Sequence, residues 1–343
     1  MNRRTLVGLG GAAVAAVGAA VLLTPREAAT PLPSAAQLAF PGLAQRLGSA
    51  ARVEVRRADA TLALVRQSGD VWTLPDKANY PARGERVREL LVGLTELRLT
   101  EPRTANPELL QRLGLEDPAQ PGATSALLRV LDSGGAPILE LVTGRRRVRT
   151  QGNLPESIYV RRPAESQAWL AEGRLNIDAD PQLWIDRDVA NLPRDRVQRV
   201  EVSRDGATLA LARAGDADAP LRLVTPADAP PTDDVALDEI GRALEVLTFT
   251  DVRREADLGG EAVGESRFTL TDNLSVTARV TRDNEAIWLR LAAAGDDEAA
   301  RLNARWRGWA YQVGAWKEKA FAPRLEDLRR QEPRDPGAAP AAP

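Results

Sequence analysis

The chain has 343 residues, of which 43% are hydrophobic and 27% are charged, a balance that is ordinary for a folded body. Its length exceeds that of one typical domain, so we expect two domains. It contains no histidine and no cysteine, which excludes Ser-His-Asp and Cys-His triads and histidine-based zinc sites. The net charge of −2 provides no general basic field, so we expect no nucleic-acid partner.

Residues 1–24 have the pattern of an N-terminal membrane anchor. Arg3 and Arg4 precede an uncharged run from Thr5 to Thr24, and roughly 20 such residues cross a bilayer as one helix. Positive charge before the span keeps that end in the cytoplasm, which places the body on the extracytoplasmic (periplasmic) side of the cytoplasmic membrane. No convincing Ala-x-Ala cleavage site follows, so we expect an uncleaved, single-pass signal anchor, with a cleaved signal peptide as the alternative. Residues 25–50 then read as a tether that leads into the body.

The rest of the chain contains an internal repeat. Residues 53–57 followed by 60–64 recur as 200–204 followed by 207–211, at a constant offset of 147. Alternating apolar and polar positions predict a two-stranded hairpin in each copy. We therefore expect two homologous modules, at 51–193 and 194–330, followed by a Pro- and Ala-rich tail at 331–343 that should be disordered.

Each copy continues with a helix whose apolar residues follow helical spacing. These residues are Val87, Leu90, Leu91, Leu94 and Leu97 in the first copy and Leu237, Ile240, Leu244 and Leu247 in the second. A later match, 157–161 with 286–290, falls at an offset of 129, so the first copy contains about 20 extra residues, for which 106–122 is the candidate. Each copy closes with a tryptophan segment, beginning at Trp184 and Trp309. This order predicts an α+β fold of two tandem modules, each an antiparallel sheet with helices, after an N-terminal transmembrane helix.

Five groups of residues, in this order, resemble a known family. They are Phe40-Pro41-Gly42-Leu43, Trp72-Thr73-Leu74 with Tyr80-Pro81, Leu113-Gly114-Leu115-Glu116-Asp117-Pro118, Trp184-Ile185-Asp186, and Gly308-Trp309-Ala310-Tyr311-Gln312-Val313 with Leu325-Glu326-Asp327-Leu328. The chain is similar over most of its length after the anchor to a bacterial domain-of-unknown-function family associated with gliding-motility-type ABC transporter components. The resemblance implies a membrane-tethered accessory protein near such a transporter, and it supplies no catalytic residues and no cofactor.

The best binding candidate is an arginine cluster made of Arg145, Arg146, Arg147 and Arg149, with two further arginines at 161 and 162. Guanidinium groups bind carboxylates and lipid headgroups through paired hydrogen bonds, so this cluster predicts contact with an anionic partner. The other interpretation, which we favour, is a solvated hairpin edge, where charge discourages pairing between sheets.

Two other groups of residues have a functional and a structural interpretation. The aromatic residues Trp306, Trp309, Tyr311, Trp316 and Phe321 suit a stacking platform for a sugar or acyl chain, but core packing is favoured because only 4% of residues are aromatic. Acidic groups at 178–180, 216–218 and 296–298 lack the Gly and Glu positions of an EF-hand loop, so we expect no metal.

We therefore expect a non-enzymatic, membrane-anchored accessory protein that works with an ABC-type transporter or an envelope complex. One alternative is a module that binds a lipid or small amphiphile at the repeat junction, near residues 184–193, since ligand clefts favour domain interfaces. Another is an envelope glycan hydrolase with paired carboxylates, which requires neither histidine nor cysteine.

Overall fold

The computed structural model describes residues 36–147, 156–215 and 219–330 of the chain. The predicted anchor, the predicted tail and Arg149 lie outside these residues. Within the described ranges, no helix is both long enough and apolar enough to span a bilayer.

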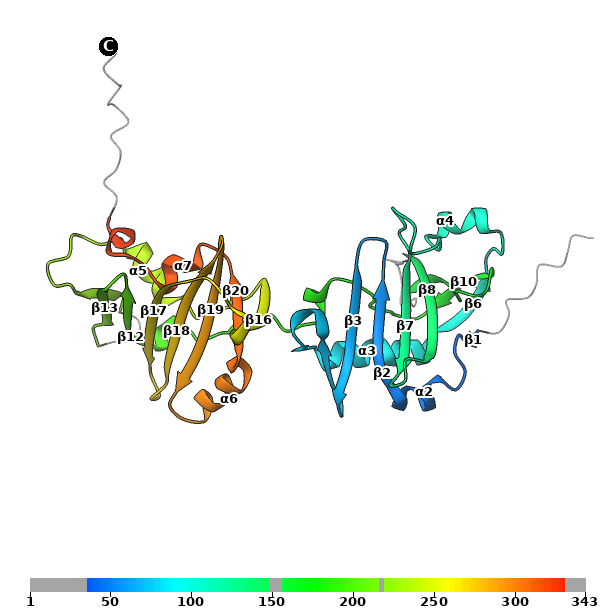
Figure 1. Ribbon diagram of the computed structural model, residues 1–343, viewed down its shortest axis with the longest axis horizontal. Helices are drawn as coiled ribbons and strands as arrows, with labels where there is room; N and C mark the ends of the chain where they lie inside the picture. The colour runs from blue at the N-terminus through cyan, green and yellow to red at the C-terminus, as the bar shows by residue number, and fades with distance from the viewer. Residues whose placement is uncertain (1–35, 148–155, 216–218, 331–343) are drawn as a thin grey trace, which may run out of the picture.

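The described residues form an α+β fold built on two large antiparallel sheets, which lie side by side in Figure 1. The first sheet has the strand order β1-β6-β10-β9-β8-β7-β2-β3-β4-β5 and the second has the order β14-β13-β12-β17-β18-β19-β20-β16. A small third sheet pairs β11 with β15. The predicted class, antiparallel sheets with helices, is confirmed.

The elements of the first sheet and its helices all come from residues before 173. The strands are β1 (Gln37–Leu38), β2 (Ala50–Arg56), β3 (Thr61–Ser68), β4 (Val71–Leu74), β5 (Tyr80–Pro81), β6 (Arg98–Pro102), β7 (Ala126–Asp132), β8 (Pro137–Arg147), β9 (Ser157–Arg161) and β10 (Ala168–Glu172). The helices are α2 (Leu43–Arg46), α3 (Gly84–Glu96) and α4 (Leu110–Leu113), with short 3₁₀ turns η1 (Leu47–Ser49), η2 (Pro75–Lys77) and η3 (Pro107–Leu109).

The remaining elements follow a short connecting segment. That segment holds η4 (Pro181–Leu183), β11 (Asp188–Ala190) and η5 (Arg194–Arg196). The later strands are β12 (Val197–Arg204), β13 (Ala207–Arg213), β14 (Leu221–Thr225), β15 (Leu247–Thr248), β16 (Asp251–Arg254), β17 (Glu261–Leu270), β18 (Ser275–Asp283), β19 (Ala286–Ala294) and β20 (Trp309–Val313). The later helices are α5 (Asp234–Gly241), α6 (Asp297–Trp306) and α7 (Lys317–Phe321), with η6 (Glu255–Asp257) and η7 (Leu325–Leu328).

The spacing of apolar residues along each strand and helix decides which side chains are buried in each core. In the first hairpin Val53 pairs with Leu64 and Val55 with Leu62, and all four side chains are buried on one face of the sheet. The stripe of α3 is buried at Val87, Leu90 and Leu94, and Figure 1 shows that helix behind the first sheet. The second hairpin repeats the arrangement by pairing Val200 with Leu211 and Val202 with Leu209. Apolar residues at period 2 on strands and at helical spacing on a helix thus form one dry layer between them.

The connecting segment is attached to both sheets. Ile185 forms a backbone bridge with Ala82 beside the first sheet, whereas β11 pairs with β15 in the second half of the chain. Trp184 is fully buried, and its indole donates a hydrogen bond of 3.0 Å to the carbonyl of Asp178. The residues at 184–187 that were matched to the closing strand of the second copy are therefore part of this connector, and they form no strand of the first sheet.

An aromatic contact joins the two halves. Tyr80 of β5 packs edge-on against Trp309 and Phe249, at ring-centroid distances of 4.8 and 5.5 Å. The ring of Tyr311 completes the cluster, with its centroid 6.5 Å from that of Tyr80. Burial raises the pKa of Tyr80 and of Tyr311, so both phenols stay neutral at physiological pH.

Polar contacts surround this aromatic cluster. Lys77 forms an ion pair of 2.7 Å with Asp251. Arg254 donates a hydrogen bond of 3.2 Å to the carbonyl of Ala78, and its guanidinium lies 3.7 Å from the centre of the Trp309 ring. The two sheets are thus held together by edge-on aromatic packing, an ion pair and a hydrogen bond.

We predict that Tyr80→Ala, in a protein beginning at residue 31, lowers the free energy of unfolding by roughly 3–5 kcal/mol, the usual cost of removing a buried aromatic ring. Because the ring fills the contact between the halves, chemical denaturation should change from one transition to two. The control is Val235→Ala, since Val235 is 68% exposed and should cost less than about 0.5 kcal/mol. A single unshifted transition in Tyr80→Ala would contradict this account of the interface.

Candidate functional site

The residues that were predicted to be extra in the first half fold over the outer face of the first sheet. Asn106 starts the segment by accepting a hydrogen bond of 3.0 Å from the backbone N–H of Glu108, and Gly114 ends α4 with a positive φ of 66°. Leu110 and Leu115 are buried against Val142 and Ala168, in a cluster separate from the main core. The segment is therefore an addition to a sheet that already has its own core on the other face.

Glycine allows this segment to approach the sheet. A Cβ atom on Gly144 of β8 would lie 2.3 Å from the carbonyl oxygen of Leu113 and 2.7 Å from that of Gly114. The pairing of β8 with β9 also shifts register between Thr143 and Arg146. A bulge with a glycine in it is a usual means of letting another backbone lie close to a sheet.

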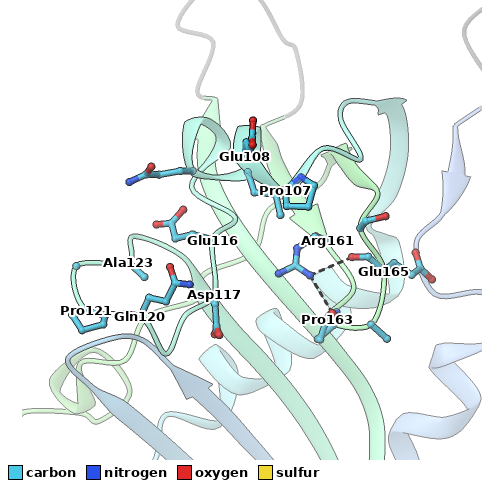
Figure 2. A pocket seen from close by; sticks show the side chains of 15 residues that line it. Pro107, Glu108, Glu116, Asp117, Gln120, Pro121, Ala123, Arg161, Pro163 and Glu165 are labelled. Carbon is cyan, nitrogen blue, oxygen red and sulfur yellow. Dashed lines mark hydrogen bonds between the residues drawn. The ribbon is translucent and has the colours of Figure 1, made fainter.

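The segment and the turn between β9 and β10 enclose a cavity of about 590 Å³. Its lining residues are Pro107, Glu108, Leu110, Gln111, Glu116, Asp117, Gln120, Pro121, Gly122, Ala123, Arg161, Pro163, Ala164, Glu165 and Ser166. Figure 2 shows the acidic and amide side chains around the opening, with Arg161 between the segment and the turn. The volume lies within the range of about 300–1,000 Å³ that is typical of ligand pockets.

Arg161 acts as a clamp between the two walls. Its Nη1 donates to the carbonyls of Arg162, Pro163 and Glu165 at 3.4, 3.1 and 3.2 Å, and its Nη2 donates to the carbonyl of Leu115 at 3.4 Å. Figure 2 marks the contacts with the turn. The guanidinium therefore holds backbone rather than presenting its charge to the cavity.

The charges of the cavity are mainly negative, because its lining includes four carboxylates and one guanidinium. Burial lowers the pKa of Arg161, and Asp117 opposes the shift. Burial alone would raise the pKa of Glu116, but hydrogen bonds from Thr124 and Ser125 outweigh it and the pKa is lowered. The Glu116 carboxylate is consequently ionised at neutral pH. One of its oxygens accepts hydrogen bonds from the backbone N–H and the hydroxyl of Thr124.

The described members of the predicted arginine cluster, Arg145, Arg146 and Arg147, lie at the end of β8 and outside the lining of this cavity. The side chain of Arg145 lies against Gly114, since a Cβ there would be 3.1 Å from Arg145 Cγ. Arg146 donates a hydrogen bond to the carbonyl of Leu175, and Arg147 pairs with Ser157 in the sheet. All three are exposed.

The aromatic and acidic groups singled out in the sequence have structural roles, with the exception of Trp316, wherever the structure describes them. Four of the five aromatic residues are buried, namely Trp306, Trp309, Tyr311 and Phe321, whereas Trp316 is 65% exposed. Asp178, Asp180 and Asp296 accept hydrogen bonds from backbone N–H groups two residues later. Residues 216–218 lie outside the described residues. In the described ranges no cluster of three or more acidic side chains could hold a metal ion.

The sequence did not identify the carboxylates and prolines of the cavity as site residues. Two signals pointed to this segment: the change of offset between the matched residues marked 106–122 as additional, and 113–118 was one of the groups that resemble the family. Neither showed where the segment folds. Extra residues that a repeat does not need are a place where function can be added.

Together, the two large antiparallel sheets and the cavity under an added segment define an α+β protein with a ligand-sized pocket outside its main core. The chain belongs to the family described as Domain of unknown function (DUF4340), which matches residues 72–263, more than half of its length. No curated protein and no solved structure matches the chain. The expected membership in a domain-of-unknown-function family is thus confirmed, and the association with an ABC transporter stays a prediction.

We predict that Gly144→Ala displaces the added segment, because the new methyl group would overlap the Leu113 carbonyl. Overpacking of this kind costs about 1–3 kcal/mol. Hydrogen exchange at the amides of Leu110 and Leu115 should accelerate while the amides of α3 stay protected. The control is Gly48→Ala, where a Cβ would meet nothing within 4 Å. Equal protection of the segment in both variants would disprove the close approach.

Proposed function

We propose that this protein is a non-enzymatic accessory protein, tethered by residues 1–24 to the outer face of the cytoplasmic membrane, that works with an ABC-type transporter or another envelope complex. The cavity behind residues 106–122 receives a positively charged side chain of that partner. The observation that carries the proposal is the cavity itself, whose ionisable groups suit binding better than proton transfer.

Three features of the cavity favour binding of a cationic group. Glu108, Asp117 and Glu165 line it, and Glu116 keeps its charge because its pKa is lowered. Glu165 also forms an ion pair of 2.9 Å with Arg162. Arg161 is committed to backbone carbonyls, so it opposes a cation less than a free guanidinium would. Opposite charges at an interface steer association and fix orientation.

The hydrolase alternative finds less support in this cavity. A glycosidase needs one carboxyl group with a raised pKa to act as the acid. The pKa of Glu116 moves in the other direction, and the lining contains no tryptophan within the described residues. Nothing in this pocket therefore favours glycan cleavage over binding.

The amphiphile alternative placed its cleft at the junction of the two halves. There the side chains of Trp184, Val189 and Leu192 are buried, and the Trp306 indole donates a hydrogen bond of 2.9 Å to the carbonyl of Val189. This packing favours a structural role for the junction.

We further propose that the two halves arose by duplication, so that the accessory body consists of two related modules. Support comes first from strand order, since β6-β10-β9-β8-β7-β2-β3-β4 in the first sheet corresponds to β16-β20-β19-β18-β17-β12-β13-β14 in the second. A second support is a shared arginine contact. Arg66 donates to the carbonyl of Ala50 at 3.2 Å and Arg213 to that of Val197 at 2.9 Å, at the same offset of 147.

A third support lies on the outer faces of the sheets. Tyr159 has Arg103 over its ring at 5.9 Å, and at the matched position Trp288 has Arg253 over its ring at 4.3 Å. In the first half the added segment also packs against Tyr159. The two halves therefore differ in what covers this face, and the cavity lies in the first half.

The anchor can be tested by insertion. Replacing Val14 with Arg and Ala15 with Asp should impair membrane insertion by several kcal/mol, roughly 2.5–3.5 for each charge at the centre of a helix. Deletion of residues 1–30 should instead release a soluble, folded body, because the two sheets contain their own cores. The measurement is fractionation, with protease added to intact spheroplasts. If the full-length protein resists external protease, its body lies on the cytoplasmic side of the membrane, and the proposed orientation is contradicted.

The partner can be tested by site-specific photo-crosslinking of the full-length protein in its native host. A crosslinker at Gln120, on the cavity rim, should capture a membrane subunit of an ABC-type transporter. The same crosslinker at Thr277, on the outer face of the second sheet, is the control. Reversing the rim charge with Glu108→Lys and Asp117→Lys should reduce the Gln120 product at least fivefold. Recovery of the uncrosslinked monomer alone from Gln120 would count against an accessory role.

A further inference from the structure

A second cavity, of about 430 Å³, opens in the second half of the chain, away from the first sheet. It lies between the β12–β13 hairpin and the segment that follows α7, and Figure 1 places this hairpin on the side of the second sheet remote from the first. The lining residues are Val202, Arg204, Asp205, Ala207, Thr208, Leu209, Pro226, Pro323, Arg324, Leu325 and Glu326. This site shares no residue with the cavity at 106–122.

The walls are apolar because the inner face of the hairpin is incompletely covered there. Val202 pairs with Leu209 and Arg204 with Ala207, so these four side chains share one face of the sheet. Val202 and Leu209 are buried, whereas Ala207 at the tip is exposed. The apolar surface of the core thus continues into the cavity.

One charged side chain is buried among these walls. The side chain of Arg204 is only 6% exposed. It donates to Glu318 at 3.0 Å through Nη2 and to the carbonyl of Ala322 through Nη1. Its Nε has no hydrogen-bond partner in the part of the chain that the structure describes. A buried N–H without an acceptor destabilises the folded protein, so a ligand oxygen that reached it would be stabilised.

The carboxylate of Asp205 occupies a position in this cavity where an anion contacts two arginines. Oδ2 of Asp205 lies 3.0 Å from Nε of Arg324 and 3.5 Å from Nε of Arg204. Asp205 stands in the hairpin turn at a φ of 52°, with a side chain that is 61% exposed. Two guanidinium groups therefore converge on one oxygen at the mouth of an apolar cavity.

We propose that this cavity binds a single-chain amphiphile with a singly charged anionic head group. The chain lies against Val202, Leu209 and Leu325, while the head group takes the position of the Asp205 carboxylate between Arg204 and Arg324. This proposal goes beyond the accessory role and does not depend on it.

The charges around the mouth set the preferred head group. Arg204 and Arg324 are opposed by Asp205 and Glu326, which also line the cavity, while Glu318 is shared between Arg204 and Arg282. A doubly charged phosphate would meet more repulsion than a carboxylate or a phosphodiester. The head group exchanges the Asp205 contacts for contacts of the same charge-assisted kind, so burial of the alkyl chain against the apolar walls supplies the net affinity.

The test uses the full-length protein in phosphatidylcholine nanodiscs with a photoreactive, diazirine-bearing fatty acid as the probe. Mass spectrometry should map the label to residues 202–209 and 323–326. Laurate should compete at least tenfold better than dodecyltrimethylammonium, because only its head group is negative. Lauroyl lysophosphatidylglycerol, whose phosphodiester carries one charge, distinguishes a phospholipid from a free fatty acid as the source of the ligand.

Three variants test the geometry. Asp205→Asn keeps a residue that tolerates positive φ and removes the competing charge, so labelling at low probe concentration should rise at least threefold. Ala207→Trp fills the cavity and should reduce labelling at least tenfold. Ser203→Trp places the same ring on the opposite face of the hairpin and should leave labelling unchanged. Label spread over the whole surface, equal competition by the cationic chain, no effect of Ala207→Trp, or weaker labelling of Asp205→Asn would each overturn the proposal.

Discussion

The packing of Tyr80 into the second half of the chain is the contact on which the overall arrangement depends. Two consecutive residues with positive φ, Ala78 at 53° and Asn79 at 61°, turn the backbone immediately before Tyr80. Such conformations cost free energy for residues other than glycine and persist where surrounding contacts hold them. Here the Ala78 carbonyl accepts a hydrogen bond from Arg254, whose guanidinium covers Trp309. The turn at 78–79, the Trp309 ring and Arg254 thus stabilise one another, and they come from three different parts of the sequence.

Arginine has a second use in this protein besides surface charge. Only three of the 46 basic residues are lysines. Arg66, Arg161, Arg204 and Arg213 each donate hydrogen bonds to backbone carbonyls. A guanidinium has five N–H donors in a fixed plane, so it can hold several carbonyls at once, which an ammonium group does less well. This explains why the cavity at 106–122 contains an arginine and is still negative in character.

The two cavities follow from the same architecture in different ways. Each sheet buries one of its two faces against helices. The cavities form where another part of a sheet is covered by a different segment or is left partly uncovered. At residues 106–122 an added segment covers the outer face of the first sheet, and a small separate cluster around Leu115 holds it there. At the β12–β13 hairpin the inner face extends beyond its cover, so the core surface is open and Arg204 is buried at its edge. One cavity is therefore polar and the other largely apolar.

Local periodicity in the sequence determined the hairpins, helix α3 and the α+β class, because alternation and helical spacing decide which side chains can be buried together. It predicted the second helix only in part, since α5 ends at Gly241, whereas Leu244 and Leu247 of the predicted stripe lie beyond it. The start of α5 also rests on a local contact, since Asp233 accepts a hydrogen bond from the backbone N–H of Val235. Tertiary structure alone decided that Trp184 belongs to the connector, that Tyr80 enters an aromatic cluster of the other half, and that 106–122 folds over β8. Those outcomes depend on contacts between residues far apart in the chain, which no local pattern encodes. The sequence contains Gly144, but only the fold shows that the backbone of Leu113 lies against it.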